Sequence, residues 1–241
     1  MRLINNLQKR GGRIILEAAK PLQNTLDKSA EKGGFLGIDL TSAEAKLSAC
    51  LGLDRELRLT YSGFLHQDSD ILKLTSRHRF KLVAIDAPLS LPKGLCCLEE
   101  SCSCQPRGEV KGRNCERQLR KQGIPVFPTT KKTFIKKLIY RGIKLKTELE
   151  AMGYEVIEIY PYASKVRLFG RNIPKKTTPA GLAFLKQRIC QLLPDIAPSV
   201  DGFNHDMCDA AIAAYTAYLH SQGKTELCGE PEEGAICLPF S

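Results

Sequence analysis

The sequence lacks the long apolar runs of membrane-spanning and secreted proteins. Its longest largely apolar run, residues 210–219, is about half of the roughly 18 to 20 residues that a membrane span needs. The N-terminus carries no apolar stretch of the length that a signal peptide requires. We therefore expect a soluble, cytoplasmic protein with no membrane span.

The sequence also has little of the compositional bias that marks disordered, collagen-like or low-complexity proteins, and it contains no internal repeat. Hydrophobic residues make up 43% and charged residues 26% of the 241 residues, which is ordinary for a folded protein. This length is sufficient for one large domain or two small ones.

Acidic side chains are scarce in the middle of the chain, although the formal net charge of the whole is only +10. Residues 107–192 hold 20 basic and 6 acidic side chains, whereas residues 193–241 hold 1 basic and 8 acidic ones. A basic middle beside an acidic tail is typical of a protein that handles polyanions near a metal-binding acidic cluster. The alternative is that the lysines and arginines only solubilise one face.

The ten cysteines include no paired C-x2-C motif of the kind found in many zinc sites. Without a secretory signal we expect thiols or metal ligands rather than disulfides. Five of them lie in one stretch rich in Gly, Pro and charge, namely Cys96, Cys97, Cys102, Cys104 and Cys115. Four thiolates suit a tetrahedral zinc ion, and the alternative is that these are incidental thiols. Because the stretch follows Asp86, we expect it to overhang a functional cleft.

Two regions are expected: a basic helical extension at residues 1–32, and one domain at residues 33–241 with a Cys-rich, basic insertion at about 92–130. Apolar residues recur at helical spacing in the extension. It packs on the domain in our preferred interpretation, and contact with a membrane surface or a partner is the alternative.

Within the domain, the apolar periodicity predicts an α/β protein in the order β-β-β-α-β-α-β-α, closed by a last short strand. Three strands, 35–40, 46–53 and 56–65, form an antiparallel meander. The strand at 81–86 is apolar throughout, as expected for a strand buried on both faces. The remaining elements are helices at 68–78, 131–152, 178–193 and 203–221 and strands at 154–160 and 235–238.

Carboxylates follow or interrupt three of the predicted buried strands. Asp39 and Asp86 each close an apolar strand, and Glu158 lies inside another. If the three strands are parallel neighbours, these side chains converge at the carboxyl edge of the sheet, where ligands bind in such folds. Their mutual repulsion requires cations, and hard oxygen ligands favour Mg²⁺ or Mn²⁺.

Two more acids, Asp206 and Asp209, are three residues apart on a predicted helix, so they share a face. The rest of this helix is rich in alanine, which lets it approach a sheet closely and deliver its acids to the strand ends. For Asp206 the alternative is an N-terminal helix position, which the helix dipole favours for acids.

In order and spacing, these segments resemble a widespread, uncharacterised family of predicted nucleases with a ribonuclease-H-like fold. The resemblance is carried by Gly37-Ile38-Asp39, Ala84-Ile85-Asp86-Ala87-Pro88, Glu158-Ile159-Tyr160-Pro161, Lys175-Lys176-Thr177-Thr178-Pro179, Asp206-x-x-Asp209-Ala210 and Glu232-Glu233-Gly234. The helix motif is most similar to that of the Holliday-junction resolvases of the same superfamily.

The resemblance implies a five-stranded mixed sheet flanked by helices and two-metal cleavage of phosphodiester bonds. It implies that Asp39 bridges both ions while Asp86 and Asp209 each hold one. Asp206 or Glu158 would complete the set. His205 would orient the water, and the alternative for this residue is a helix cap.

Basic side chains are concentrated in the segment that begins at Arg107, interleaved with Phe127 and Phe134, and Lys175 and Lys176 add to them. If they line the same edge as the acids, they hold phosphates while the metals act. The residues concerned are Arg113, Arg117, Arg120, Lys131, Lys132, Lys136, Lys175 and Lys176. No base-reading module is present, so we expect contacts to shape and backbone.

The leading hypothesis is therefore a metal-dependent nuclease. The alternative is a nucleic-acid-binding protein that keeps the fold without turnover. A phosphotransferase related to sugar kinases and actin ranks last, because that architecture needs two such domains and Gly-rich phosphate loops.

Overall fold

The structure is a computed structural model that describes residues 33–43, 45–107 and 111–241. The extension predicted at residues 1–32 lies outside the described residues. The described residues all belong to one unit of the chain, Glu31–Ser241. No helix within them is both long and apolar enough to cross a membrane.

The first three strands form the predicted antiparallel meander. Strand β1 (Phe35–Asp39) pairs with β2 (Ser48–Leu53), and β2 pairs with β3 (Leu59–Leu65). All of β2 is buried, whereas β3 alternates between half-buried and exposed positions. This alternation marks β3 as an edge strand with one face towards water, and the sheet begins there.

Two parallel strands continue the sheet on the other side of β1. Strand β4 (Leu82–Asp86) runs parallel to β1, and β5 (Glu155–Ile159) runs parallel to β4. The apolar run of β4 is buried along its length up to the half-buried Asp86, as its sequence predicts for a strand between two others. The expectation that the acid-bearing strands are parallel neighbours is confirmed.

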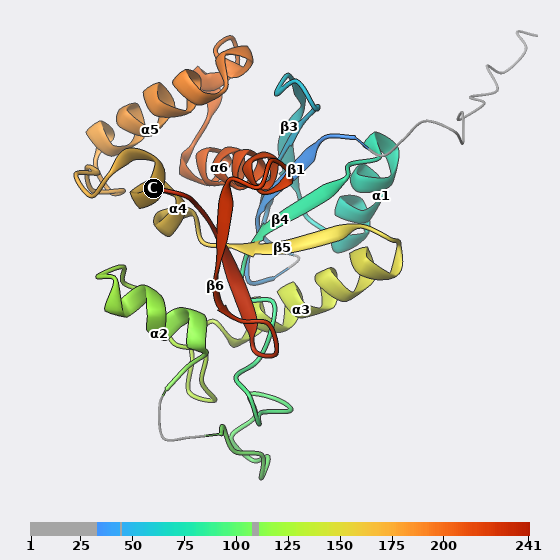
Figure 1. Ribbon diagram of the computed structural model, residues 1–241. Coiled ribbons are helices and arrows are strands. Elements are labelled where there is room, and N and C mark those ends of the chain that lie inside the picture. The colour runs from blue at the N-terminus through green and yellow to red at the C-terminus, as the bar shows by residue number, and fades with distance from the viewer. Residues whose placement is uncertain (1–32, 44, 108–110) are drawn as a thin grey trace, which may run out of the picture. The chain divides into compact units, whose positions relative to one another are not determined.

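The sheet has seven strands, in the order β3-β2-β1-β4-β5-β7-β6, and not the five expected from the resemblance. The difference is a C-terminal hairpin of β6 (Thr225–Glu230) and β7 (Gly234–Pro239), in which β7 pairs parallel to β5 (Figure 1). Half of the residues of β6 are polar, and all but Cys228 are half-buried or exposed. The segment therefore lacks the alternating apolar pattern that would have predicted a strand.

Six α-helices connect and cover the strands in the described part of the chain. Their bounds are α1 Asp68–His78, α2 Asn114–Lys121, α3 Lys136–Ala151, α4 Pro161–Phe169, α5 Pro179–Leu192 and α6 His205–Ser221. Four of them were predicted, α1 with both ends correct. Helices α2 and α4 were not predicted, because both are short and α2 is mainly polar. Short 3₁₀ turns at Pro194–Ile196 and Val200–Gly202 lead from α5 to α6.

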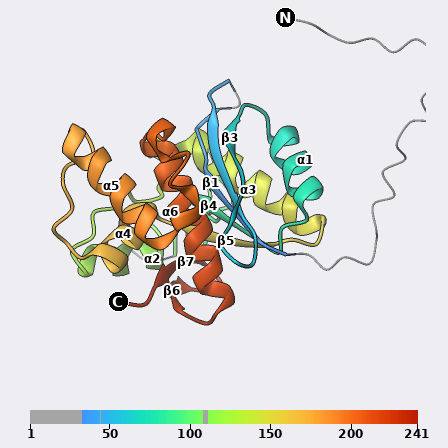
Figure 2. The same cartoon turned by 90° about the horizontal axis from the view of Figure 1, so that it is seen from above.

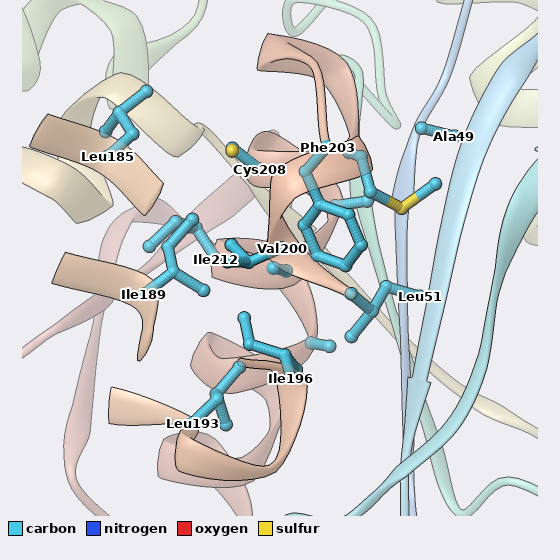
Figure 3. Close-up of a cluster of buried hydrophobic side chains, with 14 of the residues drawn as sticks. Ala49, Leu51, Leu185, Ile189, Leu193, Ile196, Val200, Phe203, Cys208 and Ile212 are labelled. Carbon is cyan, nitrogen blue, oxygen red and sulfur yellow. The ribbon is translucent and has the colours of Figure 1, made fainter. Parts of the chain in front are cut away.

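The helices form one layer on each side of the sheet. Figure 2 shows α5 and α6 on one side of the strands and α1 and α3 on the other. Buried residues of α1 and α3 pack on one face of β1 and β4, while α6 packs on the opposite face. In Figure 3, α5 closes over α6 through Leu185 and Ile189, which join Leu51 of β2 in one apolar cluster.

Helix α6 lies unusually close to β1, and Gly37 is the reason. A Cβ atom added at Gly37 would lie 2.0 Å from the carbonyl oxygen of Ala210 and 2.3 Å from the amide nitrogen of Ala214. Only glycine therefore fits at this position against the alanine-rich face of the helix. This close approach brings the start of α6 to the carboxyl edge of β1 and β4.

Candidate functional site

Asp39 and Asp86 lie side by side at the carboxyl edge of the sheet. Each is the last residue of its strand, and the two are opposite each other in the parallel β1–β4 register. Residues opposite each other in register leave the sheet on the same face. Leu82 and Ala84, which alternate with Asp86 on this face, pack against α6. Both carboxylates therefore lie on the side of the sheet that α6 covers.

Two further acids reach this edge from the start of α6. Asn204 caps the helix by accepting a hydrogen bond from the amide of Met207 over 2.9 Å. One turn further on, Asp209 is buried, while Asp206 is exposed at the rim. Next to them, Nδ1 of His205 is buried and has no hydrogen-bond partner among the described residues.

The acids are close enough to change one another's ionisation. Burial, followed by the negative charges of Asp209 and Asp206, raises the pKa of Asp39 to about 7. Burial, followed by the charges of Asp39 and Asp209, raises the pKa of Asp86 well above its usual range. Raised carboxyl pKa values of this origin mean that negative charge is costly at this edge of the sheet.

Two lysines offset part of this charge by binding Asp209. Nζ of Lys165 on α4 lies 2.7 Å from Oδ1 of Asp209, and Nζ of Lys176 lies 3.0 Å from Oδ2. Lys165 is buried, whereas the side chain of Lys176 is 55% exposed. By contrast, no hydrogen bond or ion pair involves the carboxylate of Asp39 or Asp86 within residues 33–43, 45–107 and 111–241. The charge of these two acids is therefore not balanced by direct contacts.

Lys165 is a site residue that sequence reasoning missed. It lies on α4, which was not predicted because the segment follows β5 directly and begins with Pro161. Proline is well tolerated in the first turn of a helix, and Ala163 and Lys165 follow it on one buried face. The sequence signal that could have revealed Lys165 is a lysine next to the small residues Ala163 and Ser164, shortly after a buried strand.

A hollow of about 340 Å³ opens at this site. Asp86, Asp209 and both lysines contribute to its wall. The other lining residues are Pro125, Tyr160, Pro161, Tyr162, Ile173, Pro174 and Leu185. A second hollow of about 180 Å³ also borders Asp86 and extends towards Phe127. Phe127 and Phe134 are 62% and 75% exposed and pack edge to face, with their ring centres 4.9 Å apart.

Glu158, the fifth predicted acid, has different partners. In the β4–β5 register Glu158 is opposite Ile85, so its side chain leaves the sheet on the face opposite to that of Asp86. Its two carboxylate oxygens accept hydrogen bonds from Arg113 over 2.6 and 2.7 Å, and one also accepts from the amide of Leu89. The structure thus corrects the prediction that Glu158 joins the acids of the carboxyl edge, because its side chain lies on the opposite face of the sheet.

Arg113 was predicted to bind nucleic acid, and the structure corrects this as well. It is 1% exposed and also holds Glu116 over 2.9 Å, so its guanidinium is not accessible to a phosphate. Burial of an arginine requires paired carboxylates, and Glu116 and Glu158 provide them. Arg113 therefore contributes to the structure of the α2 region.

The remaining predicted basic residues differ in exposure. Lys132, Lys175 and Lys176 are exposed, whereas Arg117, Arg120, Lys131 and Lys136 are half-buried. Several of the half-buried side chains are engaged: Arg117 donates to the carbonyl of Gly112 over 2.6 Å, and Lys131 donates to the carbonyl of Cys102. Of these seven residues, all within the described part of the chain, only Lys176 contacts an acid of the carboxyl edge, namely Asp209.

The cysteine loop separates into two parts. Cys96, Cys97, Cys102 and Cys104 have ligand atoms that all lie within 4.8 Å of one another. In the described residues, this is the single group of three or more His, Cys, Asp or Glu residues that meets this spacing. Cys115 is not part of it: it is buried in a separate apolar cluster with Leu119 and Cys228.

The donor atoms at the sheet edge suit a hard divalent cation, but only in part. Asp39 and Asp86 offer carboxylate oxygens that contact no lysine or arginine, and this chemistry fits Mg²⁺ or Mn²⁺. Both oxygens of Asp209 are engaged by lysines, and the acids do not approach one another within 4.8 Å as a set. The carboxylates of Asp39 and Asp86 are therefore available to a cation, whereas each oxygen of Asp209 already accepts a hydrogen bond from a lysine.

A family model matches residues 27–234, which is most of the chain. The protein belongs to the DUF429 family. The description of this family is "Protein of unknown function (DUF429)", so membership establishes kinship and leaves the activity to be inferred from the site. The matched residues include all four acids of the carboxyl edge and the four clustered cysteines.

Among solved structures, the chain is similar to that of RuvC from Thermus thermophilus, with 14% sequence identity and a TM-score of 0.44. The similarity covers 85% of this chain and 99% of that one. No curated protein matches the sequence.

Proposed function

We propose that this protein is a metal-dependent nuclease that hydrolyses phosphodiester bonds of nucleic acid on a ribonuclease-H-like sheet. The observation that carries the proposal is the pair Asp39 and Asp86, opposite each other at the ends of two parallel strands. Their carboxylates have raised pKa values and no partner in contact within the described residues. When both carboxylates are ionised, such a pair is unfavourable unless a cation binds it.

When bound, Mg²⁺ or Mn²⁺ lowers the pKa of water and offsets the charge that develops on the phosphate. Asp39 and Asp86 would hold the ion. Asp206, exposed one turn before Asp209, would orient the water or help to hold a second ion. In a two-metal mechanism Asp209 would hold the second ion, and Lys165 and Lys176 would compete with that ion for its charge.

The surroundings of the acids suit a nucleic acid. Lys176 is exposed next to Asp209 and is placed to bind a phosphate once its partner changes. Phe127 borders the hollow that reaches Asp86 and packs against the exposed ring of Phe134. Exposed aromatic rings stack on nucleic-acid bases. Lys132 and Lys136 follow in the same part of the chain and add positive charge.

The alternative is a nucleic-acid-binding protein without turnover, and one observation favours it. Lys165 and Lys176 each bind one oxygen of Asp209, as expected if ammonium groups take the place of a metal ion. This alternative predicts salt-sensitive binding and no cleavage with any divalent cation.

The test is cleavage of a panel of single-stranded, double-stranded and branched DNA and RNA with Mg²⁺ or Mn²⁺. Substituting residues that only orient a metal ligand costs about 10–100-fold, so Asp39→Asn, which removes a ligand, is expected to reduce the rate by at least about 100-fold. Asp70→Asn, the same change at a half-buried position of α1 where the carboxylate pairs with Lys73, serves as the control. Unchanged cleavage by Asp39→Asn refutes the proposal, and binding without cleavage by the wild type supports the alternative.

A further inference from the structure

The tip of the loop between β4 and α2 gathers four thiols at the spacing of a metal site. The sulfur atoms of Cys96, Cys97, Cys102 and Cys104 all lie within 4.8 Å of one another, and those of Cys96 and Cys102 are 3.6 Å apart. In a tetrahedral zinc site with Zn–S bonds of about 2.3 Å, the sulfurs are about 3.8 Å apart. The four sulfurs therefore need only small adjustments to surround one ion.

The base of this loop is closed by the backbone. The amide of Arg107 donates to the carbonyl of Lys93 over 2.7 Å, so the two ends of the loop are joined. Gly94 makes this possible: its φ is +92°, and an added Cβ would lie 2.5 Å from the carbonyl oxygen of Gln105. All four cysteines thus lie within one short closed segment, which restricts their separation before any ion binds.

The loop is also anchored to α3 between its cysteines. Leu98 is fully buried, and its amide donates to the hydroxyl of Tyr140 over 2.7 Å. The same hydroxyl donates to Glu99 over 3.0 Å, and Lys136 lies 3.4 Å from the other oxygen of Glu99. Lys131 donates to the carbonyl of Cys102. Four thiolates around Zn²⁺ leave two negative charges, and the ammonium group of Lys131 at the carbonyl of Cys102 offsets part of them.

The remaining cysteines do not compete for this role. Cys50, Cys115, Cys208, Cys228 and Cys237 are buried, and Cys190 lies on α5. The exposed or half-buried thiols of the loop are therefore a distinct group and not part of the core. Leu98 is the buried apolar anchor of the loop. A segment with so small a core is typically held in place by a bound metal ion or by disulfides.

We propose that Cys96, Cys97, Cys102 and Cys104 bind one Zn²⁺ ion, and that this ion fixes the loop against α3. Four protein ligands leave no open position on the ion, so the site is structural rather than catalytic. The proposal is independent of the nuclease proposal, because the four cysteines are not among the acids or the lysines that contact them.

Metal content of the full-length protein tests the proposal directly. The protein is purified under reducing conditions without chelator, and zinc is measured by plasma mass spectrometry. We expect one zinc per chain, lowered at least fivefold in Cys97→Ser and in Cys104→Ser and unchanged in the control Cys190→Ser. Cobalt added to the metal-free protein is expected to give the intense visible and thiolate-to-metal bands of a tetrahedral tetrathiolate site.

Two results overturn the proposal. One is a wild-type protein that contains no zinc and shows no cobalt bands after reconstitution, a result that does not depend on the folding of any variant. The other is a zinc-free protein in which peptide mapping under non-reducing conditions places two disulfides among Cys96, Cys97, Cys102 and Cys104, with an intact mass lower by four hydrogens. Nuclease activity is not a readout in either case, so this test and that of the proposed function fail separately.

Discussion

Asp39 and Asp86 are paired residue to residue across two parallel strands, and each is the last residue of its strand. Neither carboxylate contacts a hydrogen-bond donor within the described residues, whereas Asp209, across from them on α6, binds two lysines. The negative charge of the site is thus neutralised on one side only. We therefore expect the stability of the protein to depend on the protonation of Asp39.

The stability of the metal-free protein should fall as the pH rises towards and through 7. The pKa of Asp39 is about 7 in the folded protein, against an ordinary value of 3.8. A raised carboxyl pKa means that the folded state binds more protons, so the stabilisation is complete below about pH 4 and is lost as the pH passes the folded value. Urea unfolding of chelator-treated protein from pH 4 to pH 8.5 measures this.

Asp39→Asn should flatten this pH dependence and raise the stability at pH 8 relative to the wild type. Added Mg²⁺ should stabilise the wild type at pH 8 and have little effect on the variant, because a ligand that binds only the folded state adds to its stability. Parallel pH profiles for the two proteins would contradict the prediction.

Gly37→Ala should displace α6 from the sheet. The added Cβ meets backbone atoms of α6 at 2.0 and 2.3 Å, and a helix backbone cannot yield as a side chain does. We expect a loss of about 3 kcal/mol or more, at the upper end for overpacked cores. Gly202→Ala is the matched control, since an added Cβ there has no atom within 4 Å and should change stability by less than about 0.5 kcal/mol. Thermal unfolding followed by circular dichroism compares the two, and equal stabilities would contradict the account of Gly37.

Arg113→Met should destabilise the protein strongly although it removes no residue of the acidic site. The substitution leaves Glu158 and Glu116 buried without their cation, and breaking a buried ion pair costs about 3–5 kcal/mol. Adding Glu158→Gln should recover part of this loss, because it removes one of the unpaired charges. Arg117→Met, on the same helix but half-buried, should have a small effect. Urea unfolding measures all three, and additive losses in the double variant would argue against the pairing.

Phe127→Ala combined with Phe134→Ala should weaken the binding of single-stranded oligonucleotides about tenfold or more, since stacking contributes about 1–3 kcal/mol per base. Phe240→Ala, at an exposed position near the C-terminus, is the control. Fluorescence anisotropy with a labelled oligonucleotide and catalytically inactive Asp39→Asn as the parent measures the change. An unchanged affinity would remove these rings from the proposed binding surface.

Most of the sheet and its helices could be predicted from the chain alone. The apolar run that ends in Asp86 predicted a strand buried on both faces, and α1 begins and ends where its pattern indicates. The alanine-rich stretch after Asp209 predicted a helix close to a sheet, which Gly37 makes possible. These features depend on local periodicity and side-chain size, and both can be read directly in a sequence.

What could not be predicted depends on partners distant in the sequence. Glu158 looked like a member of the acidic site until the register placed it on the opposite face, where Arg113 binds it. Lys165 had no visible role until α4 brought it to Asp209. Likewise, the spacing of the cysteines did not show that Cys104 belongs to the group of close thiols and that Cys115 does not. The closed loop that begins near Gly94 gathers the four thiols and leaves Cys115 outside. The sequence alone determined which segments are buried and where the acids stand along them. Only the tertiary structure decided which charges meet. A one-residue change of register places a side chain on the other face of the sheet, and pairing between distant segments leaves no periodic pattern in the sequence.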